Sequence, residues 1–303
     1  MNDSLGPAPV ESTCIDRQEA RWPLRHLTLA GLHWPGRNKS HGNPPVVMLH
    51  GWLDNSLSFV RLGPELQAFT DVYAVDLAGH GRSDHRPEGQ SYLLADYVAD
   101  LAELIEGSFS EPVDLVGHSL GGIVSMLYAA AFPEKVRKLV VIDSLGPISK
   151  TPEETISQLR KGILKRLAGS GRSAGYLTIE EAAAARAGGL SPLSAEAAMQ
   201  LVPRNLREGD TGFEWRTDPR LRYPSLMMFA EQQALACLEA VTTETLLVRA
   251  EQGLLADRNR WQARLDAMPA LTEVVVSGTH HCHLDGDTAP VADAIKSFLS
   301  YGR

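Results

Sequence analysis

The sequence contains little cysteine and no long apolar run. Its three cysteines, Cys14, Cys237 and Cys282, are odd in number and widely spaced, which argues against a disulfide framework and indicates reduced thiols. No stretch approaches the roughly 20 apolar residues that a membrane helix needs. Residues 1–7 include an acidic side chain and lack the apolar core of a signal peptide. We therefore expect a cytoplasmic protein without a membrane span.

An excess of basic residues is also lacking. The formal net charge is −8 at pH 7, which argues against nucleic acid or an anionic membrane surface as a default partner. The chain has an ordinary globular composition, with 44% hydrophobic and 22% charged residues among 303. That length suits one large α/β domain with an insertion, or two domains.

Short apolar runs alternate with amphipathic stretches in two parts of the chain. The expected strands cover residues 25–34, 46–49, 72–75, 113–116, 136–142, 245–248 and 272–276. The expected helices around them cover residues 59–69, 92–106, 122–132, 257–267 and 289–299. This alternation predicts an α/β fold with a doubly wound, mostly parallel sheet that binds ligands at the carboxyl ends of its strands.

A long helical stretch separates the two alternating parts. It contains helical patterns at 156–167, 179–187, 195–201 and 226–240, and no convincing buried strand. We therefore divide the chain into a loosely ordered segment 1–20, a core of 21–145, a helical cap of 146–240, and the second part of the core, 241–303.

The sequence Gly-His-Ser-Leu-Gly-Gly at 117–122 joins an expected strand to an expected helix. A Gly-x-Ser-x-Gly pattern in that context predicts a nucleophile elbow, a strained turn that projects Ser119 above the edge of the sheet. Gly117 and Gly121 fit because side chains there would collide with the neighbouring strand and helix. The alternative is a glycine-rich turn in which the serine is incidental.

Further motifs extend this pattern along the chain. They are His50-Gly51-Trp52 after a buried strand, Asp76-Leu-Ala-Gly-His-Gly-Arg-Ser83 after the next, and Gly278-Thr-His-His-Cys-His283 near the end. With the elbow, they make residues 25–300 resemble an α/β-hydrolase. The segments 49–55, 142–147 and 212–218 are similar to those of the serine hydrolase-like proteins.

This resemblance implies a serine nucleophile, Ser119, activated by a histidine base. Members of the superfamily place that base ahead of a second histidine three residues on, which matches His280 followed by His283. His281 is the alternative base. We expect no metal, because these histidines have no cysteine or carboxylate partners at ligand spacing.

The acid of the triad departs from the common pattern. The resemblance places it after the seventh strand, where this chain has Gln252 and Gly253. Asp143, which follows the strand 136–142, is the alternative that we favour. It could instead cap the next helix, in which case Glu251 or Asp257 would be the acid.

The same resemblance implies an oxyanion hole and a pocket. The backbone amides of Trp52 and Leu120 would stabilise the developing negative charge. Asp76, His80 and Arg82 would brace the rim of the site, whereas Asp54 and Asn55 would contact substrate or cap a loop. The expected pocket residues are Trp52, Leu145, Phe213, Trp215, Met228 and Leu284, with Met227 and Phe229 as further wall residues.

A serine at the elbow implies acyl transfer to water, which predicts a carboxylic ester hydrolase for small to medium apolar acyl groups. We expect a small-molecule ester as substrate and no cofactor. A carbon–carbon bond hydrolase or an amidase would use the same triad. An inactive ligand-binding protein is the alternative from another class, and the sequence leaves the oligomeric state open.

Overall fold

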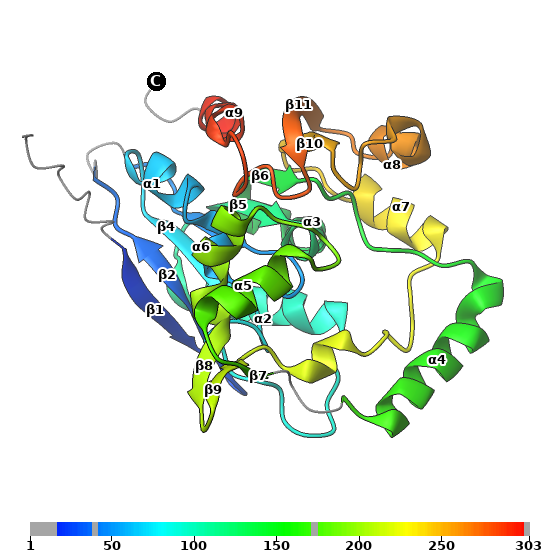
Figure 1. The fold of residues 1–303 in the computed structure, drawn as a ribbon. Coiled ribbons are helices and arrows are strands. Elements are labelled where there is room, and N and C mark those ends of the chain that lie inside the picture. The colour runs from blue at the N-terminus through cyan, green and yellow to red at the C-terminus, as the bar shows by residue number, and fades with distance from the viewer. Residues whose placement is uncertain (1–16, 38–41, 171–174, 300–303) are drawn as a thin grey trace, which may run out of the picture.

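A mostly parallel sheet forms the centre of the protein in a computed structural model that describes residues 17–37, 42–170 and 175–299 (Figure 1). Its strand order is β1-β2-β4-β3-β5-β6-β10-β11. The strands are β1 Gln18–Pro23, β2 Thr28–Trp34, β3 Val46–Leu49, β4 Val72–Asp76, β5 Val113–His118, β6 Val136–Ile142, β10 Thr245–Gln252 and β11 Leu271–Thr279. Strand β2 pairs antiparallel with β1 and β4, and all other pairs are parallel. The doubly wound, mostly parallel sheet predicted from the sequence is confirmed.

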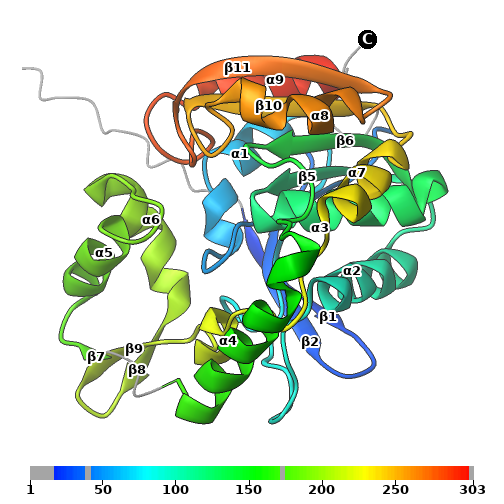
Figure 2. The same cartoon turned by 90° about the vertical axis from the view of Figure 1, so that its right-hand side faces the viewer.

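Helices cover both faces of this sheet (Figure 2). In β3, Val46 and Met48 belong to a core cluster with α1 (Leu62–Gln67) and α9 (Ala289–Leu299). The alternate residues Val47 and Leu49 belong to a second cluster with four helices. Those helices are α2 Leu94–Ser108, α3 Leu120–Ala131, α7 Glu231–Glu239 and α8 Gln262–Asp266. Because side chains alternate along a strand, a wholly apolar strand serves two cores.

The N-terminal boundary of the core differs from the expected one. The sequence places residues 1–20 in a loosely ordered segment, but β1 begins at Gln18 and pairs with β2 along its length. Trp22 of β1 is buried, and a Cβ atom on Gly31 of β2 would lie 2.8 Å from its ring. Pairing and burial of one tryptophan therefore order a segment whose sequence is polar. Residues 1–16 lie outside the described residues.

The segment between β6 and β10, called the insert below, contains α4 Thr155–Ala168, α5 Ile179–Ala187, α6 Ala195–Asn205 and α7. It also contains a small sheet in the order β7-β9-β8, of β7 Gly175–Tyr176, β8 Leu206–Gly209 and β9 Gly212–Trp215. These strands were not expected, because none of them is a buried apolar run. The helix expected at 226–240 begins only at Glu231.

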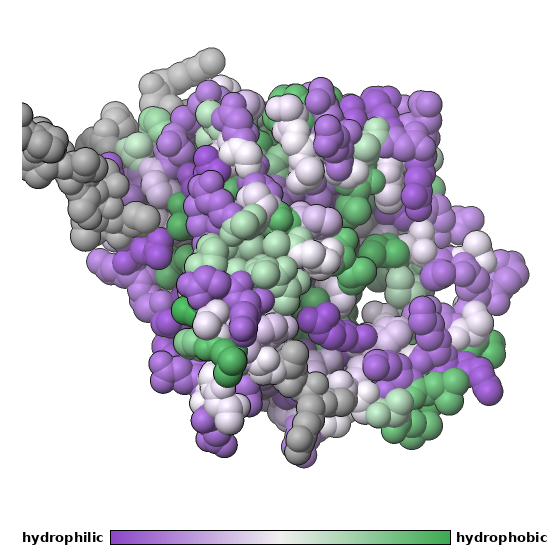
Figure 3. Space-filling view, viewed as in Figure 1, coloured by the Kyte–Doolittle hydropathy of each residue, from purple (hydrophilic) through white to green (hydrophobic). Residues whose placement is uncertain are grey.

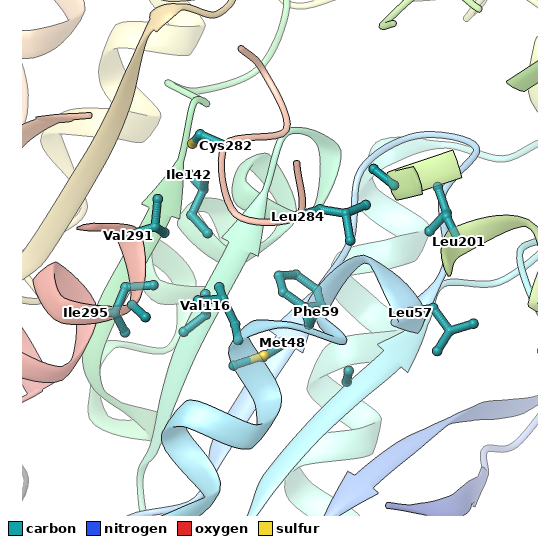
Figure 4. Packing of buried hydrophobic residues seen from close by; sticks show 14 of the residues in the cluster. Met48, Leu57, Phe59, Val116, Ile142, Leu201, Cys282, Leu284, Val291 and Ile295 are labelled. Carbon is teal, nitrogen blue, oxygen red and sulfur yellow. The ribbon is translucent and has the colours of Figure 1, made fainter. Parts of the chain in front are cut away.

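The insert is anchored to the core through α6 and α7, whereas α4 is largely exposed. Leu201 of α6 joins the core cluster that contains Leu57, Phe59 and Leu284 (Figure 4). In contrast, apolar side chains lie exposed on the surface over α4 (Figure 3). One of them, Leu167, is 79% exposed. None of the helices among the described residues combines the length and hydropathy that crossing a membrane requires.

A buried carboxylate at the end of β4 braces the loops that surround the carboxyl edge of the sheet. Asp76 accepts hydrogen bonds from the backbone amides of Ser56 (2.7 Å) and Arg82 (2.9 Å), and from Nε of Arg204 in the insert (2.8 Å). His50 Nε2 accepts from the amide of Leu77. Nearby, burial and then the neighbouring His50 lower the pKa of His80 to about 3.

We expect the core to respond strongly to loss of volume at α1. Leu66 is fully buried there, whereas Leu167 on α4 is exposed. Leu66→Ala should lower the free energy of unfolding by about 2–5 kcal/mol, because the change removes apolar contacts and leaves a cavity. Leu167→Ala, the same change on a helix surface, should stay within about 0.5 kcal/mol. Urea denaturation of the two variants measures both values, and equal effects would contradict this assignment of the core.

We also expect His80 to make stability depend on pH. Its folded pKa of about 3 lies below the ordinary value of about 6.5, so the unfolded state binds more protons between these pH values. The stability is therefore present above about pH 6.5 and lost as the pH falls, by up to about 1.4 kcal/mol per unit. His80→Asn should reduce this slope in chemical denaturation between about pH 6 and pH 4. His26→Asn is the control, because His26 is exposed, and the effect of His80 is the difference between the two slopes.

Candidate active site

Ser119 lies in a strained turn between β5 and α3. Its backbone has φ 49° and ψ −115°, a conformation that a residue with a side chain rarely adopts. A Cβ atom on Gly117 would lie 2.5 Å from the carbonyl oxygen of Gly121, and one on Gly121 would lie 2.0 Å from that of Leu49. Glycine at both positions therefore allows the sharp turn from strand to helix that the sequence pattern predicts.

Asp143 also has a strained backbone, with φ 45°, directly after β6. Its buried carboxylate accepts hydrogen bonds from the amides of Leu254 (2.6 Å) and Leu255 (3.3 Å), in the turn after β10. A Cβ atom on Gly253 would lie 2.2 Å from Oδ2. The carboxylate therefore fills the space that a side chain at Gly253 would take. The two other acids considered from the sequence, Glu251 and Asp257, are exposed.

His280 follows β11 and reaches Asp143. Its Nδ1 lies 2.7 Å from Oδ2 of Asp143, and because a carboxylate only accepts, Nδ1 carries the proton of this bond. His118 contacts the same segment. Its Nε2 lies 2.9 Å from the carbonyl oxygen of His280, and the two ring centroids are 4.5 Å apart. Burial, and then the neighbouring histidines, hold the pKa of His118 well below its usual value, so its ring is neutral.

A cavity of about 430 Å³ opens at Ser119 and Asp143. Its walls come from the start of the insert and from the loop that follows β10. The other lining residues are Ile123, Ser144, Leu145, Gly146, Ile148, Ser149, Glu231, Leu254, Leu255, Arg260, Trp261 and Arg264. Arg264 pairs with Glu231 at 2.7 Å. The cavity thus combines apolar side chains with a neutralised charge pair and the exposed Arg260.

Most of the pocket residues expected from the sequence lie elsewhere. Leu145 lines the cavity at Ser119, but Trp52 and Trp215 line a separate cavity of about 200 Å³. Met228, with Met227, lines a third of about 160 Å³. These residues therefore do not line the cavity that opens at Ser119, because apolar character alone does not reveal the direction of a side chain.

Two further residues of that set are packing residues. Leu284 is 1% exposed and belongs to the core cluster (Figure 4). The partly buried Phe213 packs against the same cluster. The sequence analysis missed Leu254, Trp261 and Arg260. Their position directly after the carboxyl end of an expected parallel strand was the available signal.

The backbone segments that carry Trp52 and Leu120 are joined. The amide of Gly121 donates to the carbonyl oxygen of His50 (3.0 Å), which holds the start of α3 against the turn that follows β3. His50 Nδ1 donates to the carbonyl oxygen of Gly51, which helps to hold this loop. Leu120 is the first residue of α3, so its amide has no acceptor within the helix and is available to a ligand.

His281 points away from Asp143 into a separate buried cluster. Its Nε2 lies 3.0 Å from Asp54 Oδ2, and Arg186 Nη2 lies 2.8 Å from Asp54 Oδ1. Burial alone would raise the pKa of Asp54, but His281 and Arg186 outweigh it and hold that pKa below the ordinary range. Asp54, His118 and His281 offer ligand atoms within 4.8 Å of one another, a spacing compatible with a metal ion. The guanidinium of Arg186, however, already neutralises this carboxylate.

Comparisons with known proteins agree with this architecture. The family model for the alpha/beta hydrolase fold matches residues 44–287. A serine hydrolase-like protein of Danio rerio is 32% identical over 93% of this chain and 88% of its own length. The crystal structure of a hypothetical protein from Pseudomonas aeruginosa PAO1 is 39% identical, with a TM-score of 0.87, over 93% of this chain and 99% of its own.

A second solved structure, that of E-2-(acetamidomethylene)succinate hydrolase, is 26% identical with a TM-score of 0.74, over 94% of this chain and 99% of its own. The family match covers the elbow, the strand ends and the histidine-rich loop. This chain therefore belongs to the alpha/beta hydrolase fold family and is similar over most of its length to the serine hydrolase-like proteins.

Proposed function

We propose that this protein hydrolyses carboxylic esters of small to medium apolar acyl groups, with Ser119 as nucleophile, His280 as base and Asp143 as acid. The observation that carries the proposal is the 2.7 Å hydrogen bond between His280 Nδ1 and a buried Asp143 carboxylate that faces the same cavity as Ser119. Strained turns at Ser119 and Asp143 fit a site whose geometry is held for chemistry.

In the proposed mechanism, His280 Nε2 takes the proton of Ser119 Oγ as that oxygen attacks the ester carbonyl. Asp143 keeps the proton on Nδ1 and stabilises the imidazolium that forms. The amides of Trp52 and Leu120 receive the negative oxygen of the tetrahedral intermediate. His280 then gives its proton to the leaving alcohol, and a water molecule cleaves the acyl-enzyme by the same steps.

The cavity supports the proposed substrate class. Its apolar walls at Leu145, Ile148 and Leu254 suit an acyl chain, and its volume of about 430 Å³ is that of a small-ligand site. Residues 146–240 would act as a helical cap over this site. We further propose a small-molecule substrate, because the net charge of −8 disfavours nucleic acid. A cytoplasmic location is proposed because three widely spaced cysteines indicate reduced thiols.

Amide hydrolysis is the second candidate. The name of the 26% identical hydrolase contains an acetamido group, and an acyl-enzyme mechanism cleaves esters and amides alike. The alternative of an inactive ligand-binding protein is motivated by the lack of an acid at the usual position after β10. Because the Asp143 carboxylate fills the space beside Gly253, the geometry favours an active site instead.

We expect Ser119→Ala to abolish hydrolysis of chromogenic esters, because the acyl-enzyme then has no site of attachment. Purified protein should be assayed on a series of increasing acyl length, which also measures the capacity of the pocket. Ser157→Ala, at an exposed serine of α4, is the matched control and should retain wild-type turnover. Turnover that survives in Ser119→Ala would refute the assignment of the nucleophile, and amide turnover without ester turnover would favour the second candidate.

We expect Asp143→Asn to lower kcat by roughly 10³–10⁴-fold, because an amide no longer holds the imidazole in its reactive tautomer. Glu251→Gln makes the same chemical change at the exposed acid near the end of β10 and should stay within about twofold. Steady-state kinetics on one ester measures both. A larger loss of kcat in Glu251→Gln than in Asp143→Asn would show that the acid of the triad lies at the end of β10.

A further inference from the structure

The turn that carries the Trp52 amide is held largely by the insert. Asn205 Nδ2 donates to the carbonyl oxygen of Leu53 (3.1 Å), and Asn55 Nδ2 donates to that of Leu201 (2.9 Å). Trp52 Nε1 donates to the carbonyl oxygen of Leu221 (3.1 Å). Side chains and carbonyls of the insert therefore contact successive residues of this short turn.

Arg186 makes the charged contact of this set. It lies in α5 and places Nη2 2.8 Å from Asp54 Oδ1, with the two side chains 13% and 1% exposed. Its Nη1 donates to the carbonyl oxygen of Ser191 (2.9 Å), which fixes the guanidinium within the insert. A charged hydrogen bond that is buried from solvent is strong, and breaking it leaves a buried charge without its partner.

Asp54 in turn closes the turn itself. Its amide donates to the carbonyl oxygen of Gly51 (3.2 Å), so that Trp52 and Leu53 form the bend between them. Leu53 has φ 65°, a left-handed conformation that a leucine adopts only where surrounding contacts hold it. A turn under strain needs an external restraint, and the ion pair supplies one at its last residue.

The other side of Asp54 faces the histidine loop. Asp54 Oδ2 contacts His281, the neighbour of the proposed base, and lies 4.0 Å from His118 Nδ1. His118 bonds the carbonyl oxygen of His280. The Asp54 carboxylate therefore links the turn of residues 51–54, called the oxyanion turn below, to the loop that carries His280. Arg186 fixes the orientation of this carboxylate.

We propose that Arg186 is a positioning residue: through Asp54 it couples the insert to the oxyanion turn and holds the Trp52 amide in place for the transition state. This inference rests on the proposed function. It makes the insert part of the catalytic apparatus as well as a cover for the substrate.

The test uses the neighbouring cavity. Arg186, Trp52 and Ser191 line a space of about 200 Å³, through which a small alkylguanidinium ion can reach Asp54 once the side chain is removed. Arg186→Ala should lower kcat for an ester by roughly 10–100-fold, because a small displacement of a catalytic group is costly. KM should stay within about twofold, since Arg186 is absent from the lining of the substrate cavity. Millimolar ethylguanidinium should restore part of kcat.

Arg207→Ala is the matched control, because Arg207 is an exposed arginine of the insert paired with Glu214. It should keep wild-type kcat and show no response to ethylguanidinium. Arg186→Lys keeps the charge but not the forked geometry, so its kcat should lie between those of the wild type and Arg186→Ala. It serves as the test variant if the alanine variant does not fold.

A fluorophosphonate labels Ser119 in active molecules, and mass spectrometry counts the labelled fraction. Dividing the measured rate by this fraction gives kcat per active molecule. A kcat per labelled serine equal to that of Arg207→Ala would overturn the inference, since Arg186 would then support only folding. A loss of kcat that ethylguanidinium and Arg186→Lys both fail to recover would also overturn it. A wild type that neither hydrolyses esters nor accepts the label would instead overturn the proposed function, and this inference with it.

Discussion

The hydrogen bond between Asp143 and His280 joins residues that follow two strands, β6 and β11, which are not neighbours in the sheet, because β10 lies between them. The bond forms because the residue that follows β10, Gly253, has no side chain. Gly253 leaves room for the carboxylate, and the two following amides donate to it. A buried carboxylate without such donors would be strongly destabilised. The positions of Asp143, the turn after β10 and the histidine loop therefore depend on one another.

The same turn also shapes the cavity. The amides of Leu254 and Leu255 bind Asp143, and both residues, together with Arg260, line the cavity at Ser119. The loop thus has two roles, in orienting the carboxylate and in lining the pocket. Changes in this loop would alter the proposed specificity and the proposed base together, which makes it a natural place for divergence among proteins of this fold.

Below the histidine loop lies a second buried carboxylate, Asp54, which is neutralised by an arginine of the insert. The His118 ring lies 4.5 Å from that of His280, and its Nδ1 lies 4.0 Å from Asp54 Oδ2. Burial, and then the neighbouring histidines, keep this histidine uncharged, so each carboxylate is held by its own hydrogen-bond partners. The arrangement separates two acid–histidine pairs that are adjacent in sequence at His280 and His281.

Local patterns were sufficient to predict the sheet and the elbow. An apolar run of four residues such as Val46–Leu49 has few alternatives to a strand buried on both faces. Gly117 and Gly121 are required by steric conflicts within and beside the turn itself. The three-stranded sheet of the insert escaped prediction because its strands are short and half-exposed. Strand β1 was missed because its order comes from pairing with β2.

The sequence by itself determined the alternation of elements, the strained turn at Ser119 and the choice of Asp143 as the favoured acid. These features depend on periodicity, on glycine sterics and on position at a strand end, which neighbouring residues reveal. Only the tertiary structure decided which apolar side chains line the cavity, why Gly253 accompanies Asp143, and that Arg186 reaches Asp54 across the sequence. Those features arise from contacts between distant segments, and the direction of a side chain is fixed only when the segments pack.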